Sequence, residues 1–135
     1  MPFEKQNNLS SKIAAKNKIT PPEQLKDLVV DSILEKKGEQ IAILDLRELD
    51  DTVADFFIIC EGNSNTQIRS ISDFIMENVV SKTKEKAFRY EGMENLEWVI
   101  IDYVNVVVHV FMPEKRAFYN MEELWADADI THIDN

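Results

Sequence analysis

Three side chains that could carry chemistry lie close together in the segment Glu97–Phe111, EWVIIDYVNVVVHVF. His109 could act as a base, Asp102 could orient it, and Trp98 offers a large aromatic ring. If the segment folds as a tight hairpin that turns at Val104-Asn105, strand alternation places all three side chains on one face. Asp102 then lies diagonal to His109, near the imidazole but not bonded to it.

The two faces of this hairpin differ in their chemistry. One face is almost wholly apolar and should belong to the core: Val99, Ile101, Tyr103, Val106, Val108 and Val110. The other face is mixed: Trp98, Ile100, Asp102, Val107, His109 and Phe111. Helices need to cover only one face of an antiparallel hairpin, so the mixed face is either packed or open to a partner. Valine resists the positive φ of a type I′ turn, which predicts another turn type or a longer loop at Val104.

Other reactive arrangements in the sequence are weak. Ser64 could join His109 in a catalytic triad only through tertiary placement. Cys60 lies in an apolar run with no basic neighbour to stabilise a thiolate, which predicts a buried, inert thiol. Gly62-Asn63-Ser64 could bind an anion through free amides, but a strand-to-helix turn capped by Ser64 explains the same residues. The scattered His109, His132 and Cys60 predict no metal site, and no motif for a cofactor is present.

Composition limits the class of protein and its partners. The chain has 135 residues, which suits one domain, and a net charge of -10 from 25 acidic and 15 basic residues. This charge argues against direct DNA binding and favours a basic protein partner. No apolar run approaches the roughly 20 residues that span a bilayer, so we expect no membrane association. A single cysteine and the lack of a signal peptide indicate the cytoplasm.

The elements that position these residues follow from hydrophobic periodicity and capping signals. Thr20 and Glu23 predict a capping box for a helix that ends near Gly38. Ser64 and Gln67 match the capping box of a second helix, which carries apolar residues at helical spacing: Ile68, Ile71, Ile75 and Val79. Strands are expected at residues 41–46, 56–60 and 88–90 and in the hairpin. Asn120 should cap a last helix that places three apolar residues on one side: Met121, Leu124 and Trp125.

This element order predicts an α/β fold with a mixed β-sheet flanked by helices. The single domain is expected at residues 20–127. Residues 1–19 are polar and predict a flexible N-terminal tail, and residues 128–135 predict a frayed, acidic C-terminal tail.

Several motifs, taken together in this order and spacing, carry a family resemblance. They are Asp51–Cys60 (DTVADFFIIC), Gly62–Gln67 (GNSNTQ), Glu91-Gly92, Glu97–Tyr103 (EWVIIDY), Val107–Phe111 (VVHVF) and Phe118–Trp125 (FYNMEELW). From about Pro22 to Asp127 the chain resembles the ribosomal silencing factor family, also called the Iojap family. The Val104-Asn105 turn departs from the Gly-Asp that is common there.

The resemblance implies a function in translation. It implies a nucleotidyltransferase-like fold without the catalytic residues, and thus a protein that is not an enzyme. Such a protein binds the large ribosomal subunit at the basic ribosomal protein number fourteen, blocks joining of the small subunit and represses translation under nutrient limitation. The resemblance also implies a homodimer, a state in which family members are often seen. The family-motif residues expected to bind the partner are Trp98, Asp102, Tyr103 and His109. A large-subunit assembly factor, or a nucleotide-binding enzyme near Gly62, are the alternatives.

Overall fold

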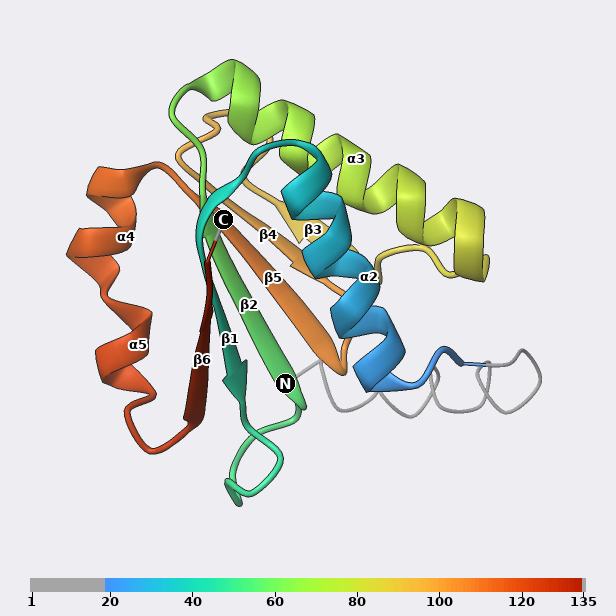
Figure 1. The fold of residues 1–135 in the computed structure, drawn as a ribbon, viewed down its shortest axis with the longest axis vertical. Helices are drawn as coiled ribbons and strands as arrows, with labels where there is room; N and C mark the ends of the chain where they lie inside the picture. The colour runs from blue at the N-terminus through green and yellow to red at the C-terminus, as the bar shows by residue number, and fades with distance from the viewer. Residues whose placement is uncertain (1–18, 135) are drawn as a thin grey trace.

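A six-stranded sheet of mixed direction forms the centre of the fold (Figure 1). The computed structural model describes residues 19–134. Its strands are β1 (Glu39–Asp45), β2 (Phe56–Glu61), β3 (Arg89–Glu91), β4 (Trp98–Asp102), β5 (Val106–Phe111) and β6 (Asp129–Ile133). In the order β3-β4-β5-β2-β1-β6, β2 and β5 run parallel and the other neighbouring pairs run antiparallel. The predicted α/β fold with a mixed sheet is confirmed.

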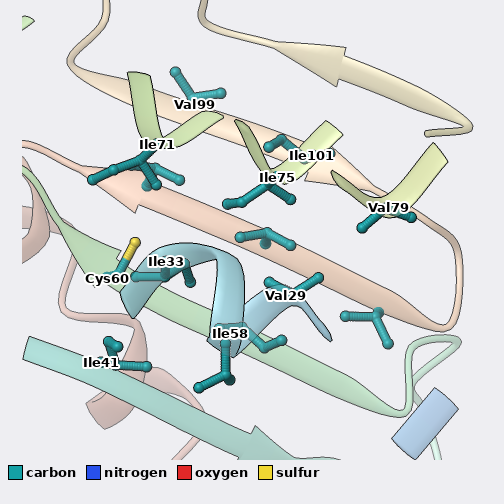
Figure 2. Close-up of a cluster of buried hydrophobic side chains, with 14 of the residues drawn as sticks. Val29, Ile33, Ile41, Ile58, Cys60, Ile71, Ile75, Val79, Val99 and Ile101 are labelled. Carbon is teal, nitrogen blue, oxygen red and sulfur yellow. The ribbon is translucent and has the colours of Figure 1, made fainter. Parts of the chain in front are cut away.

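Two long helices, α2 (Pro22–Glu35) and α3 (Asn65–Thr83), cover one face of the sheet. They lie on the same side of the strands in Figure 1, and their apolar stripes meet the strands in Figure 2. The buried helix residues recur at the three- and four-residue spacing of one helix face: Leu25, Val29, Ile33, Ile68, Ile71, Ile75 and Val79. The apolar face predicted for the hairpin packs against them, and all six of its side chains are buried.

Two short helices, α4 (Pro113–Tyr119) and α5 (Met121–Leu124), lie on the other face. We call residues 113–124 the α4–α5 element. The core beneath it is small: Ala42, Leu44, Leu46, Ala54, Ile59, Phe111 and Met121. Around this core, Phe57, Trp98, Val107 and Trp125 are only partly buried. The mixed face of the hairpin is therefore partly covered and partly accessible.

The two strands of the hairpin pair in the register that was predicted for a tight turn. Trp98 pairs with Phe111, and Ile100 pairs with His109. The Asn105 amide donates to the Tyr103 carbonyl over 2.9 Å, and Val104 between them has a φ of 73°, which together define a γ-turn. The expected departure from a type I′ turn is confirmed, but no longer loop is needed. Valine tolerates this rare conformation because hydrogen bonds hold the turn on both sides. The Asp102 carboxylate accepts the Val104 amide, and the Asn105 carbonyl accepts the amides of Asp55 and Phe56.

The expected frayed C-terminal tail is wrong for most of its length, because Asp129–Ile133 forms β6 at the edge of the sheet. This strand pairs antiparallel with β1, so that Ile133 lies opposite Ile41 and Ile130 opposite Leu44. Backbone pairing and two half-buried isoleucines outweigh the acidic composition of the segment. The predicted N-terminal tail, residues 1–19, lies outside the described residues apart from Ile19.

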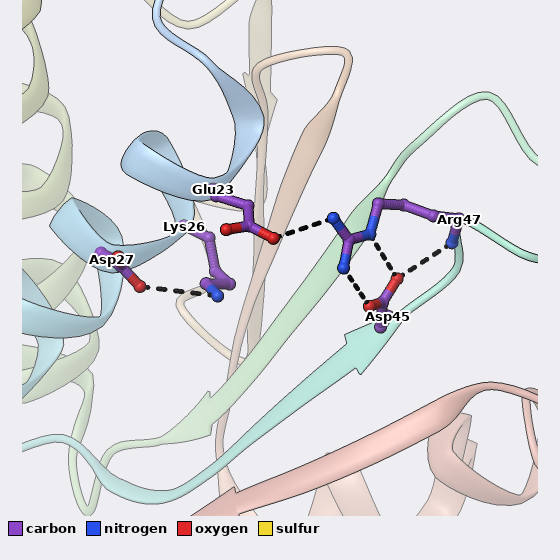
Figure 3. A network of polar contacts seen from close by, with 5 residues as sticks. All are labelled: Glu23, Lys26, Asp27, Asp45 and Arg47. Carbon is purple, nitrogen blue, oxygen red and sulfur yellow. Dashed lines mark hydrogen bonds and ion pairs between the residues drawn. The ribbon is translucent and has the colours of Figure 1, made fainter.

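The start of α2 also differs from the expected capping box. Pro21 occupies the N-cap and Pro22 begins the helix, while the Thr20 amide donates to a carboxylate oxygen of Glu85. Glu23 instead accepts a hydrogen bond from Arg47, whose guanidinium also binds Asp45 (Figure 3). This pairing holds the pKa of the Asp45 carboxyl below its usual range. The Glu23 carboxylate, which was expected to complete the capping box, thus connects α2 through Arg47 to Asp45 at the end of β1.

Candidate functional site

The structure brings together only two of the four residues expected to bind a partner. Trp98 and His109 lie side by side on the mixed face, where Trp98 is half-buried and His109 is buried. Tyr103 lies on the opposite face, under α2 and α3. Asp102 belongs to the mixed face by register, but its buried carboxylate turns toward the hairpin end. Trp98 is the member of the set with the most accessible surface.

His109 positions the Trp98 indole. The indole Nε1 donates a hydrogen bond to His109 Nδ1 over 3.1 Å. Because Nδ1 accepts this bond, the proton of the neutral imidazole resides on Nε2, which is buried and finds no partner among residues 19–134. Burial lowers the pKa of His109 to about 3. The imidazole is therefore uncharged at neutral pH and far from the pKa that general base catalysis requires.

An aromatic cluster surrounds this pair. Trp98 stacks on Phe111 with ring centroids 5.0 Å apart and contacts Tyr119 of α4 at 4.6 Å. His109 makes an edge contact with Phe57 at 5.1 Å, and Phe57 contacts Trp125 in the same way at 5.5 Å. We call these residues the aromatic face: Phe57, Trp98, His109, Phe111, Tyr119 and Trp125. Rings packed in this way present a rigid, partly exposed surface of the kind enriched at protein interfaces.

Asp102 and Tyr103 are buried in the fold at the end of the hairpin. Asp102 Oδ1 accepts the Val104 amide over 2.7 Å, and Oδ2 accepts a longer contact of 3.4 Å from Arg89 Nε. Across the turn, the Asn105 carbonyl accepts the amides of Asp55 and Phe56. The Tyr103 hydroxyl finds no partner within residues 19–134, and burial raises its pKa. These contacts fix the hairpin end, and the partner-binding role of both residues stays a prediction.

Sequence reasoning missed Arg116, which connects α4 to the sheet. Its guanidinium donates to the Gln40 carbonyl and to Glu122 Oε2 over 2.9 Å, and lies 3.5 Å from Glu61 Oε1. Gln40 has a φ of 52° at an irregularity in β1, which turns its carbonyl toward Arg116. The side chain is 10% exposed, so one buried cation holds α4, α5, β1 and β2 together. An arginine in a polar motif gave no sequence signal for this role.

The last helix faces the sheet differently from the prediction. Met121 is buried and Trp125 half-buried, as expected for the covered side, but Leu124 is 75% exposed. The helix is one turn long, and Trp125 has already left helical geometry at φ -107° and ψ 39°. Three large apolar side chains of the α4–α5 element are exposed, although Tyr119 also packs against Trp98: Phe118, Tyr119 and Leu124.

The other residues that could have carried chemistry, Ser64 and Cys60, have structural roles. Ser64 caps α3 by accepting the Gln67 amide, and the Gln67 side chain accepts the Asn63 amide, so two amides of the turn after β2 are bonded within the turn itself. Cys60 is buried, as predicted, and burial raises the pKa of its thiol to about 12. Within residues 19–134, no three His, Cys, Asp or Glu side chains are grouped to hold a metal ion. No helix of the described chain is long and apolar enough to cross a membrane.

The buried imidazole predicts a loss of stability in weak acid. The unfolded chain gains a proton near pH 6.5 and the folded chain only near pH 3, so the stability that neutral His109 provides falls as the pH drops between these values. From pH 7 to pH 5 this term should lower the free energy of unfolding by about 2 kcal/mol. His109→Gln keeps an acceptor for the indole but cannot titrate. Urea unfolding at both pH values should show a smaller loss for this variant, and equal losses would contradict the assignment.

The comparisons with known proteins agree on one family. The model of the family described as "Ribosomal silencing factor during starvation" matches residues 19–135. The chain is 38% identical over 112 residues to the ribosomal silencing factor of Halalkalibacterium halodurans, covering 83% of this chain and 94% of that protein. It is 37% identical over 100 residues to the factor of Bacillus subtilis, covering 74% and 83%. A crystal structure of a Chromobacterium violaceum protein matches with a TM-score of 0.74 at 28% identity, covering 79% and 88%.

Proposed function

Because this chain belongs to the ribosomal silencing factor family, we propose that it represses translation by binding the large ribosomal subunit. The match of the family model to residues 19–135 is the observation that carries this proposal. In this proposal the protein acts in the cytoplasm when nutrients are short. It occupies a basic surface, ribosomal protein number fourteen, where the small subunit would dock, and so blocks subunit joining.

Charge and surface chemistry support this kind of partner. The net charge of -10 favours encounter with a basic ribosomal protein and disfavours contact with the phosphates of ribosomal RNA. The aromatic face offers packed rings with a partly exposed edge at Trp98 and Tyr119. Such rings lose little conformational entropy on binding, because their neighbours already hold them.

The proposed action is steric and not catalytic. The candidate base is a buried, neutral histidine, and the only cysteine of the sequence has a thiol that burial keeps protonated. A domain that covers a docking surface needs no reacting group. It needs to bind the large subunit tightly, at a position where it excludes the small subunit.

Sedimentation with purified large subunits tests the proposal, and the protein should move with them and slow their joining to small subunits. Trp98→Ala should weaken binding about tenfold or more, because it removes the ring between His109, Phe111 and Tyr119. Tyr90→Ala is a matched control, since this exposed ring lies on β3 at the far edge of the sheet. A protein that never sediments with large subunits would refute the proposal.

Two finer properties need separate measurements. The homodimer that the resemblance implies would appear as a concentration-dependent mass in analytical ultracentrifugation. A role in large-subunit assembly would change the profile of precursor subunits in a deletion strain, whereas silencing alone would change only the joining of finished subunits.

A further inference from the structure

We propose that the α4–α5 element carries the main apolar anchors of the docking surface, and that they insert into an apolar recess bordered by lysine and arginine. This inference rests on the proposed function and names the part of the chain that makes the contact. The anchors are Phe118 and Leu124, and Tyr119 connects Phe118 to the aromatic face.

The exposure of these side chains is the first observation. Phe118 is 78% exposed and Leu124 is 75% exposed, the two largest values among the exposed large hydrophobic residues of positions 19–134. Isolated exposed apolar residues are ordinary, but these two lie six positions apart on one short element. Their ring and side-chain neighbours extend the surface inward, because Phe118 contacts Tyr119 at 5.1 Å and Tyr119 contacts Trp98 at 4.6 Å. The result is a continuous apolar surface from Phe118 of α4 to Trp98 of β4, with Leu124 exposed on the next helix of the same element.

Rigidity of the element is the second observation. The Arg116 guanidinium holds α4 to β1, β2 and α5 through its contacts with Gln40, Glu61 and Glu122. Met121 anchors the start of α5 in the core beneath it. An element fixed at two points presents its exposed side chains without a further cost of ordering the backbone, which favours binding.

The charged residues around the anchors indicate which kind of partner can bind there. Glu114 and Glu123 are exposed beside them, whereas Lys115 is paired with Glu97 at 3.6 Å and Arg116 is buried. The border of the surface is therefore acidic. RNA phosphates would be repelled, and a second copy of this chain that docked through the same surface would bring the same carboxylates face to face. A basic protein surface with an apolar recess satisfies both the anchors and the border.

Binding of the full-length chain to purified large subunits tests this inference. The variant Phe118→Ser with Leu124→Ser should weaken binding by at least about tenfold, while its thermal unfolding matches that of the parent because both side chains lie in solvent. The matched control is Val53→Ser with Tyr90→Ser, which removes two apolar side chains of 53% and 57% exposure elsewhere. The control should bind as the parent does. Glu114→Lys with Glu123→Lys should also weaken binding and reduce its dependence on salt.

Each contrary result has a distinct meaning. If the parent binds and the Phe118/Leu124 variant binds equally well, the α4–α5 element is not the anchor, and the proposed function stands without it. If the parent does not bind large subunits, both proposals fail. If the variant instead converts a dimer to a monomer in analytical ultracentrifugation, or if the parent binds protein-free ribosomal RNA through this element, the occupant is wrong and the inference is overturned.

Discussion

Replacing Arg116 with alanine should lower the free energy of unfolding by about 3 kcal/mol. Removing one partner of a buried ion pair leaves the other charge without compensation, and here two carboxylates and one backbone carbonyl lose their common donor. The affected groups belong to four elements, so α4 and α5 should loosen from the sheet. Urea denaturation followed by tryptophan fluorescence would measure the change, since Trp98 and Trp125 both lie in this region.

Two controls separate the charge of Arg116 from its geometry. Arg116→Lys keeps a positive charge but cannot donate to Gln40, Glu61 and Glu122 at once, so it should recover only part of the stability. Arg116→Met keeps most of the volume without the charge and should resemble alanine. A loss below about 1 kcal/mol for alanine would mean that Arg116 does not hold the element. Binding to large subunits should weaken in parallel with stability across these three variants.

The hairpin and the helices on its apolar face could be predicted because their signals are local. Alternation from Val99 to Val110 assigned every side chain to the correct face, and the spacing of Ile68, Ile71 and Ile75 located α3. Ser64 and Gln67 marked its start by a pattern that needs only four residues. In each case, the groups that decide the structure lie within one element or one turn.

The parts that sequence reasoning missed depend on distant partners. Arg116 binds groups 55 and 76 positions away, and no local pattern indicates such a contact. Asp129–Ile133 becomes a strand because β1 offers a free edge, although its composition resembles a tail. Leu124 follows helical spacing from Met121, but α5 ends after one turn and leaves it in solvent. The exposed anchors of the candidate site could therefore be found only from the structure.

Replacing Asp102 should have the second large effect on stability. Two variants at this position distinguish a role in holding the hairpin from direct contact with the ribosome. Asp102→Ala should lower the free energy of unfolding by about 3 kcal/mol, because the Val104 amide loses its charged acceptor in a turn with positive φ. Asp102→Asn retains an oxygen that can accept this amide. Arg89 is 54% exposed and can rotate into solvent, so asparagine should cost less than about 1 kcal/mol.

The same pair of variants decides whether the family-motif carboxylate contacts the ribosome. A buried side chain whose oxygens already bind Val104 and Arg89 has little capacity left for a partner. Asp102→Asn should therefore bind large subunits like the parent, whereas Asp102→Ala should weaken binding only as far as the hairpin end and Trp98 lose their positions. If Asp102→Asn is as stable as the parent but fails to bind, the charge itself meets the ribosome. That result would place part of the docking surface at the hairpin end, beyond the α4–α5 element.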